Sequence, residues 1–531
     1  MERLASILVS ASVILMLAAA TAAGDRSFGT APALPARTVS HPGMASLAPF
    51  TLFGWVSPPV AFTTPERYAE LADAGLNTTV LAWQDPGTPE ENAKRLACTR
   101  PVGVRNLLLD LRLDLVHENF PGTIALLDTI VATYQSDPAF LGYYLGDEPG
   151  LSEFPRLAEW FRLLRAHDPL HPGWNNLHGR LAFSAHDDWI AYLRAYASQV
   201  QPAVLCTDDY DHLVTGDRGQ FIENVAGTAQ VAREYGLPFW GIVLVIKHGS
   251  YRDVDDALLR WQVAQWLSYG CRGVGYFTYW TPAPDTTLNW GEGMITYDTG
   301  ERTTHYDQVR TLNLRLKPLG EVLAGLAWLS TEHSGGTPVG GTAFTGDSLV
   351  GGVEGRATLG TFAGADGTPY LFVANRDSSA AQTIGLELNG ERKVDRFGDA
   401  GGWASFPSTP TPHGRRVELP LAAGDFTLLR LSGGCPGLSS GTCAATLDAA
   451  PNPGSVSVRF AATRVSGGST LTIIDVNGRR IWARALDGEA PVVVWDGHTD
   501  DGARARPGFY WARLTDASGS VVRRVAWLGG K

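Results

Sequence analysis

Residues 140–149 read Phe-Leu-Gly-Tyr-Tyr-Leu-Gly-Asp-Glu-Pro, and this stretch is the most informative one in the chain. Its apolar, aromatic-rich first part is typical of a buried β-strand, and Pro149 prevents that strand from continuing. The strand ends at two adjacent carboxylates, Asp147 and Glu148. In parallel β/α architectures, functional groups collect at the carboxyl ends of the strands. The stretch therefore predicts one strand of such a fold, ending in a functional site.

Short apolar segments of this kind recur between residues 50 and 280, separated by helical patterns such as the one that Thr64 and Pro65 begin. Eight strand–helix units within about 275 residues predict a (β/α)8 barrel. The alternative, an open doubly wound sheet, is disfavoured because residues 54–59 contain no glycine-rich phosphate turn after the first strand. The predicted strands are 50–56, 76–83, 104–110, 140–147, 172–177, 203–209, 238–246 and 273–280.

After residue 328 the helical periodicity disappears, and short alternating strands separated by Gly, Asn and Asp predict two further β-domains. The expected architecture is multidomain: a (β/α)8 barrel, an antiparallel β-sandwich and a final immunoglobulin-like β-sandwich. The expected boundaries are 1–22 for a signal peptide, 23–48 for a flexible linker, 49–328 for the barrel, 329–433 for the sandwich, 434–446 for a linker and 447–531 for the last domain.

The amino-acid composition narrows the classes of molecule that we expect this protein to bind. The chain carries 43 basic and 54 acidic residues, a net charge of −11, which argues against nucleic acid or an anionic membrane as partner. Residues 4–20 are apolar after Arg3, and Ala20-Thr21-Ala22 has the small-x-small pattern of a cleavage site. We therefore expect a secreted or cell-surface protein with no membrane span after cleavage; an uncleaved anchor is the alternative.

The five cysteines predict neither a disulfide scaffold nor a zinc site, because no Cys-x-x-Cys pair is present. Cys435 and Cys443 flank a Gly/Ser-rich loop and are the expected bridged pair, whereas Cys206 lies in an apolar strand and is expected to be inert core. No EF-hand spacing, HExxH motif or Gly-x-Ser-x-Gly elbow occurs. No metal and no cofactor are therefore expected.

Glycoside hydrolysis fits a pair of acids in this position. It requires one carboxyl group that donates a proton to the leaving oxygen and a second group that acts as nucleophile, base or support. Two like charges in one site raise the pKa of one of them, which keeps a carboxylic acid protonated near neutral pH. Because strand side chains alternate, Asp147 and Glu148 both reach the mouth only if the strand breaks there, as Pro149 suggests. An acid pair that merely caps a helix is the alternative.

The stretch Gly142-Tyr-Tyr-Leu-Gly-Asp-Glu-Pro149 resembles the fourth-strand motif of (β/α)8-barrel glycoside hydrolases, over roughly residues 50–325. The largest clan of these enzymes has Asn-Glu-Pro there, and several families, including exo-acting β-N-acetylgalactosaminidases, have Asp-Glu-Pro. The resemblance implies that Glu148 is the general acid/base. It also implies that Asp147 orients a 2-acetamido group of the substrate, which itself acts as the nucleophile.

The chain departs from the large clan at the seventh strand, which ends Val245-Ile-Lys-His-Gly249 and carries no carboxylate where that clan has its nucleophile. A partner elsewhere, a substrate-assisted mechanism and loss of activity all remain open. The first candidates for a catalytic partner are Asp208 and Asp209 at the sixth strand end, and the second is Glu292; an exposed turn residue is the alternative for each.

Further polar and aromatic residues at the predicted strand ends are candidates for substrate binding. Trp280 and Tyr279 end the eighth strand, where they serve either as a sugar platform or as core. The set of candidates is Trp83, Asp110, Asn176, Tyr210, Tyr279, Trp280 and Glu292.

The last part of the chain resembles the FlgD-type immunoglobulin-like domain, which also serves as a C-terminal sorting module in bacteria with type IX secretion. The matching residues are Pro451-Asn-Pro453, Leu471-Thr-Ile-Ile-Asp475, Asn477-Gly-Arg479, Val494-Trp-Asp-Gly497, Asp501-Gly502 and Pro507-Gly-Phe-Tyr510. The resemblance implies an exported bacterial protein whose tail engages secretion or cell-surface machinery.

The sequence as a whole predicts a secreted glycoside hydrolase that acts on an oligo- or polysaccharide. The alternative is a non-catalytic carbohydrate-binding or cell-surface protein on a degenerate barrel, which the missing seventh-strand acid would explain.

Overall fold

The structure is a computed structural model that describes residues 50–82, 87–116, 122–433, 446–450, 452, 454–463, 469–475, 479–486, 492–516 and 519–529. Several predictions lie outside the described residues: the signal peptide, the linkers 23–48 and 434–446 except for residue 446, the Cys435–Cys443 pair and Trp83.

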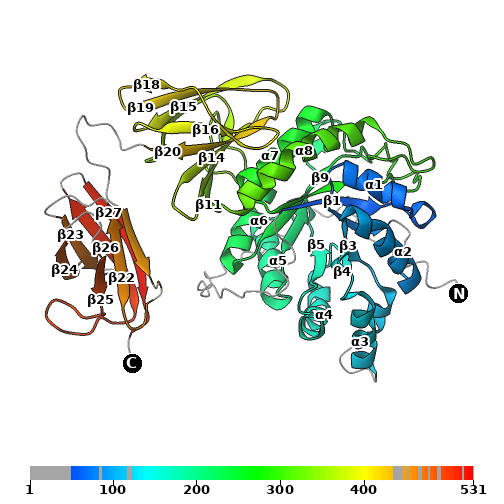
Figure 1. The fold of residues 1–531 in the computed structure, drawn as a ribbon, viewed down its shortest axis with the longest axis horizontal. Helices are drawn as coiled ribbons and strands as arrows, with labels where there is room; N and C mark the ends of the chain where they lie inside the picture. The colour runs from blue at the N-terminus through cyan, green and yellow to red at the C-terminus, as the bar shows by residue number, and fades with distance from the viewer. Residues whose placement is uncertain are drawn as a thin grey trace, which may run out of the picture. The chain divides into compact units, whose positions relative to one another are not determined.

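Eight parallel strands form the barrel, in the order β5-β4-β3-β2-β1-β10-β9-β6 (Figure 1). The sheet closes between its two end strands, where Leu177 pairs with Thr207 and its N–H donates to the Cys206 carbonyl at 2.9 Å. Each predicted strand overlaps one observed strand, so the predicted barrel is confirmed. The strands are β1 Thr51–Ser57, β2 Thr78–Ala82, β3 Arg105–Leu108, β4 Phe140–Asp147, β5 Gly173–Asn176, β6 Leu205–Asp208, β9 Phe239–Leu244 and β10 Gly273–Phe277.

Helices surround the barrel (Figure 1), and four of the eight that the structure describes begin after a Thr or Asp side chain that caps them. Thr64 accepts a hydrogen bond from the Arg67 N–H, which caps the first helix at Pro65. The helices are α1 Pro65–Asp73, α2 Pro89–Thr99, α3 Thr123–Tyr134, α4 Phe154–His167, α5 His186–Gln199, α6 Phe221–Tyr235, α7 Asp256–Ser268 and α8 Thr304–Ala324. Short 3-10 turns are η2 Val60–Phe62, η3 Arg100–Val102, η4 Leu111–Leu115, η5 Leu151–Glu153 and η6 Arg180–Ala182.

Large aromatic side chains fill the interior of the barrel. The Trp174 ring centroid lies 5.5 Å from that of Trp55, 5.9 Å from Tyr144 and 6.1 Å from Trp240, and Phe53 lies 5.5 Å from Trp240. All five are at most 5% exposed. The interior is therefore a packed core, so chemistry is confined to the open ends of the strands.

The sandwich that follows contains two antiparallel sheets, in the orders β11-β13-β14-β20-β16-β17 and β12-β15-β19-β18, around a core of its own. Its strands are β11 Ala327–His333, β12 Val350–Glu354, β13 Ala357–Ala363, β14 Pro369–Asn375, β15 Gln382–Asn389, β16 Lys393–Phe397, β17 Trp403–Ser405, β18 Thr409–Thr411, β19 Gly414–Leu421 and β20 Phe426–Ser432.

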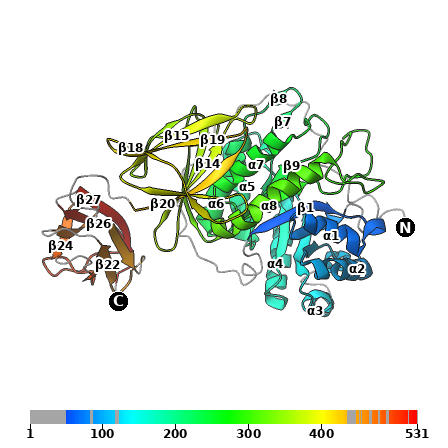
Figure 2. The same cartoon turned by 45° about the horizontal axis from the view of Figure 1, so that its top comes forward.

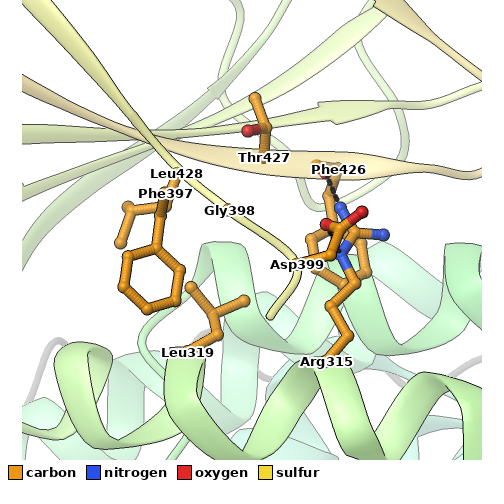
Figure 3. A pocket seen from close by; sticks show the side chains of 8 residues that line it. All are labelled: Arg315, Leu319, Phe397, Gly398, Asp399, Phe426, Thr427 and Leu428. Carbon is orange, nitrogen blue, oxygen red and sulfur yellow. Dashed lines mark hydrogen bonds and ion pairs between the residues drawn. The ribbon is translucent and has the colours of Figure 1, made fainter. Parts of the chain in front are cut away.

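Helices α7 and α8 of the barrel pack against this sandwich. Trp261 Nε1 of α7 donates to the Arg376 carbonyl at 3.2 Å, and Phe362 of β13 and Phe426 of β20 belong to the barrel core cluster. Figure 3 shows a small pocket at the contact, where Arg315 of α8 pairs with Asp399 at 2.7 Å and lies over the Phe426 ring. The sandwich therefore braces the outer helices α7 and α8 of the barrel.

The last domain also contains two antiparallel sheets, ordered β21-β22-β25 and β24-β23-β26-β27, around a separate core that includes Trp495 and Trp527. Its strands are β21 Thr446–Ala450, β22 Val458–Thr463, β23 Ser469–Ile474, β24 Arg480–Leu486, β25 Val492–Trp495, β26 Gly508–Asp516 and β27 Gly519–Trp527.

None of the described helices combines the length and apolar composition of a membrane span.

Candidate active site

The end of β4 departs from regular strand geometry, and this departure brings both acids to the barrel mouth. The β4–β5 register shifts between Tyr144 and Asp147, and Gly146 has φ +126°, which a side chain would strain. Glu148 itself has φ +44°, an uncommon conformation for a residue other than glycine. Bulges re-aim side chains beside active sites. The predicted break is thus present, but it begins at Gly146, before Pro149.

Asp147 and Asp208 are connected through Asn176, the last residue of β5. Asn176 Nδ2 donates to Asp147 Oδ1 at 3.1 Å and also hydrogen-bonds Asp208, which the Tyr210 hydroxyl contacts in turn. Desolvation, then the charges of Glu148 and Asp208, raise the pKa of Asp147 well above its usual value, although solvent reaches its side chain. Desolvation, then Glu148, raise the pKa of Asp208 in the same way. The three acids therefore act as one electrostatic unit.

Glu148 has a different partner. Its Oε1 lies 3.5 Å from Nδ1 of His178, and the two side chains are 25% and 23% exposed. Desolvation alone would lower the pKa of His178, but Glu148, then Asp147 and Glu153, outweigh it and the pKa of His178 is raised. Glu148 is thus an accessible carboxyl group with a titratable partner.

The loop after β5 holds His178 by its backbone. Trp189 Nε1 donates to the His178 carbonyl at 3.1 Å, and the Tyr192 hydroxyl accepts from the His178 N–H at 3.4 Å while donating to the Pro149 carbonyl at 2.8 Å. A side chain at Gly179 would place its Cβ 1.9 Å from the Asp208 carbonyl oxygen. Glycine there lets the loop lie against the end of β6, so β4, β5 and β6 are tied together at the mouth.

Aromatic rings form the side of the mouth beyond β6. Tyr210 stacks on Phe277 with ring centroids 5.7 Å apart, and His248 lies 6.0 Å from Tyr210 and 4.9 Å from Trp290. All but His248 are half-buried. Tyr251, beside the β7 His212–Leu213 and β8 Gly216–Asp217 hairpin (Figure 2), completes the set at 4.8 Å from His248. Through Tyr210 this aromatic wall is continuous with the acids.

Asp209 follows the last residue of β6, its charge also raises the pKa of Asp208, and its role as a catalytic group stays a prediction. It is 4% exposed, and the charges that act on it are those of Asp211, Arg218, Arg180 and Glu223. Successive strand side chains point in opposite directions, so Asp208 faces the mouth and Asp209 faces the helices.

Three of the predicted sugar-binding residues are placed elsewhere. Tyr279 is 0% and Trp280 is 1% exposed, and Trp280 packs on Phe62 at 4.7 Å, so the structure places both side chains in the core. Asp110 is 1% exposed, pairs with Arg112 at 2.7 Å and caps η4, so it is structural. Buried polar groups that are already paired are unavailable to a substrate.

The remaining three candidates lie nearer the acids or the strand ends. Asn176 is 2% exposed and donates to Asp147, while its Oδ1 has no hydrogen-bond partner in the protein, so its role as a substrate ligand stays a prediction. Glu292 is exposed, in a loop whose Gly291 N–H donates to the Lys247 carbonyl at 2.7 Å, beside the end of the seventh barrel strand. Tyr210 is at the mouth as expected.

The sequence analysis missed His178 and, of the aromatic wall, Trp290 and Tyr251. His178 follows a short strand and belongs to no motif, so its proximity to Glu148 depends on the pairing of β4 with β5. Trp290 and Tyr251 lie in long loops outside any strand pattern. The sequence feature that could have indicated these two residues is the abundance of aromatic residues after the last predicted strands.

The residues that the structure describes contain no group of three or more His, Cys, Asp and Glu side chains arranged to hold a metal ion. Cys98, Cys206 and Cys271 are unbridged and buried, and burial raises the pKa of each thiol.

Asp208→Asn is expected to stabilise the fold at high pH. The folded-state pKa of Asp208 is raised, so its contribution to stability is present below the unfolded pKa of about 3.9 and is lost as pH rises through the folded value. Asparagine cannot ionise, so the gain in unfolding free energy over wild type must be larger at pH 8 than at pH 4. Urea unfolding at the two pH values measures this difference. Equal gains in unfolding free energy at both pH values would contradict the raised pKa of Asp208.

The sequence matches no described protein family, and no curated protein sequence is significantly similar to it. Solved structures with a similar fold include a glucosidase from Croceicoccus marinus (13% identity, 72% of this chain and 95% of that one, TM-score 0.37). The GH51 arabinofuranosidase of Xanthomonas axonopodis pv. citri is 13% identical, over 75% of this chain and 98% of that one, with a TM-score of 0.39. A β-galactosidase of Marinomonas ef1 is 11% identical, over 52% of this chain and 62% of that one, also with a TM-score of 0.39. The match thus spans less than two thirds of the β-galactosidase. These TM-scores are low, so the similarity carries no conclusion about the function of this chain.

Proposed function

We propose that this chain is a glycoside hydrolase that cleaves O-glycosidic bonds of an oligo- or polysaccharide. The observation that carries the proposal is the meeting of Asp147, Glu148 and Asp208 at the ends of β4 and β6, with the pKa of both aspartates raised. Perturbed acids at the carboxyl ends of barrel strands are what this chemistry requires.

Glu148 is the general acid/base in this proposal. Its side chain is partly exposed, and it is the acid of the three that pairs with a titratable neighbour, His178, at 3.5 Å. Proton transfer needs a group that gains and loses a proton in each cycle, and a solvent-accessible imidazole beside it suits that task.

Asp147 and Asp208 are proposed as the supporting acids. Asn176 hydrogen-bonds both, so one or both can hold a proton or accept an N–H from the substrate. The seventh strand leads to Lys247 rather than a carboxylate, which favours a nucleophile carried by the substrate. Asp147 would orient that 2-acetamido group, as in the Asp-Glu-Pro families that the motif resembles.

Turnover of 4-nitrophenyl glycosides with and without a 2-acetamido group tests the proposal. A substrate-assisted enzyme releases nitrophenol only from the acetamido sugars and is inhibited by thiazoline mimics of the cyclised intermediate. Turnover without thiazoline inhibition would assign Asp208 as the second catalytic group. Binding of sugars without any turnover would instead support the carbohydrate-binding alternative, which the aromatic wall also suits.

We further propose that the chain is exported and that residues 447–531 are a FlgD-like immunoglobulin-like sorting or attachment domain. Two antiparallel sheets around a separate core support this assignment, together with the sequence resemblance. Expression in a bacterium and sequencing of the mature amino terminus tests export. A terminus that follows Ala22 is expected, whereas a retained Met1 would contradict it.

A further inference from the structure

The contact between His178 and Glu148 joins two loops that are far apart in sequence and both fixed by hydrogen bonds. The Glu148 N–H donates to the Asn176 carbonyl at 2.9 Å, and the Tyr192 hydroxyl bridges the His178 N–H and the Pro149 carbonyl. Phe183 and Tyr192 flank the imidazole ring, with ring centroids 6.3 and 5.9 Å away. The imidazole therefore meets the carboxyl group in a defined orientation.

We propose that His178 is a positioning residue for Glu148: its imidazolium orients the carboxyl group and compensates the charge left on Glu148 after proton donation. This inference rests on the proposed function. When Glu148 gives its proton to the glycosidic oxygen, the C–O bond breaks, its electron pair stays on that oxygen, and Glu148 becomes a carboxylate. A cation already in place stabilises that carboxylate as it forms.

Other groups that face His178 add to this effect. Asp147 joins Glu148 from the end of β4, and Glu153 faces the ring from η5; both favour the imidazolium. Tyr192 from α5 stays neutral because burial raises its pKa. The compensation is therefore present below the pKa of His178 and is lost as pH rises through it.

Two measurements on the full chain test the proposal, and the first does not depend on activity. NMR titration of labelled histidine should give a pKa above about 6.5 for His178, and that value should fall in Glu148→Gln. Glu148→Asp, which withdraws the carboxyl group by one methylene, provides the same comparison if the first variant does not fold. An unchanged His178 titration in both variants would overturn the proposal.

The second measurement is the pH dependence of kcat in wild type, His178→Asn and His178→Ala. Wild type should lose part of its activity at high pH with the pKa found by NMR, and asparagine, which keeps a donor but does not titrate, should abolish the part of the pH dependence that follows that pKa. At low pH we expect kcat to fall about tenfold in His178→Asn and further in His178→Ala. His167→Asn removes a comparable imidazole–carboxylate pair, with Asp128 at 2.8 Å at the far end of α4, and should change nothing.

The outcomes separate this inference from the proposed function. A uniform loss of activity with an unchanged pH limb would mean that His178 only supports the fold, which overturns the proposal. Absence of turnover by wild type would overturn the proposed function and the catalytic role of His178 together, while a shifted titration would leave the pair as a structural feature.

Discussion

Glu148→Gln is expected to lower kcat by roughly 10²- to 10⁴-fold on a glycoside with a poor leaving group, while the fold remains intact. Glutamine preserves the size of the side chain but has no proton to give to the leaving oxygen. The Glu148 N–H bond to the Asn176 carbonyl is made by the backbone, so the end of β4 should keep its geometry. Steady-state kinetics and circular dichroism measure the two effects separately.

Leaving-group dependence makes this prediction specific to proton donation. A 2,4-dinitrophenyl glycoside needs little protonation, so Glu148→Gln should reduce the glycosylation step for it far less than for an alkyl glycoside. Glu321→Gln, which changes an exposed carboxyl group on α8, is the matched control and should have wild-type kinetics. Equal losses on both substrates would show that Glu148 is not the proton donor.

Trp174→Ala is expected to destabilise the barrel by about 3–5 kcal/mol. The indole is 1% exposed and packs against Phe53, Trp55, Tyr144 and Trp240 in the barrel interior, so its removal leaves a cavity that closed strands cannot collapse. The midpoint of urea unfolding, followed by circular dichroism, should fall accordingly.

Two further variants provide stability changes with which the effect of Trp174→Ala can be compared. Trp174→Phe retains a ring in the same layer and should cost less than the alanine variant, because the residual cavity is smaller. Leu170→Ala removes an apolar side chain that is 63% exposed and should change stability by no more than about 0.5 kcal/mol. If Trp174→Ala were as mild as Leu170→Ala, the barrel interior would not be the packed core described above.

The local sequence pattern was sufficient to predict the helices and strands of this fold. Apolar runs bounded by turn residues place the strands, and the helix predicted to begin at Thr64 and Pro65 is α1 Pro65–Asp73, capped by the Thr64 side chain. These features depend on side-chain periodicity and caps, which neighbouring residues in the chain carry. The barrel then followed because eight such units in succession have few other ways to bury their strands.

The site was predictable only where a functional residue follows a strand directly. Asp147, Glu148 and Asp208 were identified because they end β4 and β6, whereas Trp280 and Asp110 also follow strands but turn into the core. Sequence alone cannot separate these cases, because side-chain direction beyond the last ladder pair depends on bulges and packing. The φ of +126° at Gly146 is such a local detail.

The amino-acid sequence by itself determined the closed parallel barrel, the two β-domains after it and an acid pair at the end of the fourth strand, because each is encoded in local periodicity. Only the tertiary structure decided which acids meet, since Asn176 links Asp147 to Asp208 across three strands. It also placed His178 beside Glu148, 30 residues away in the sequence, because parallel strand pairing, and not chain proximity, brings strand ends together.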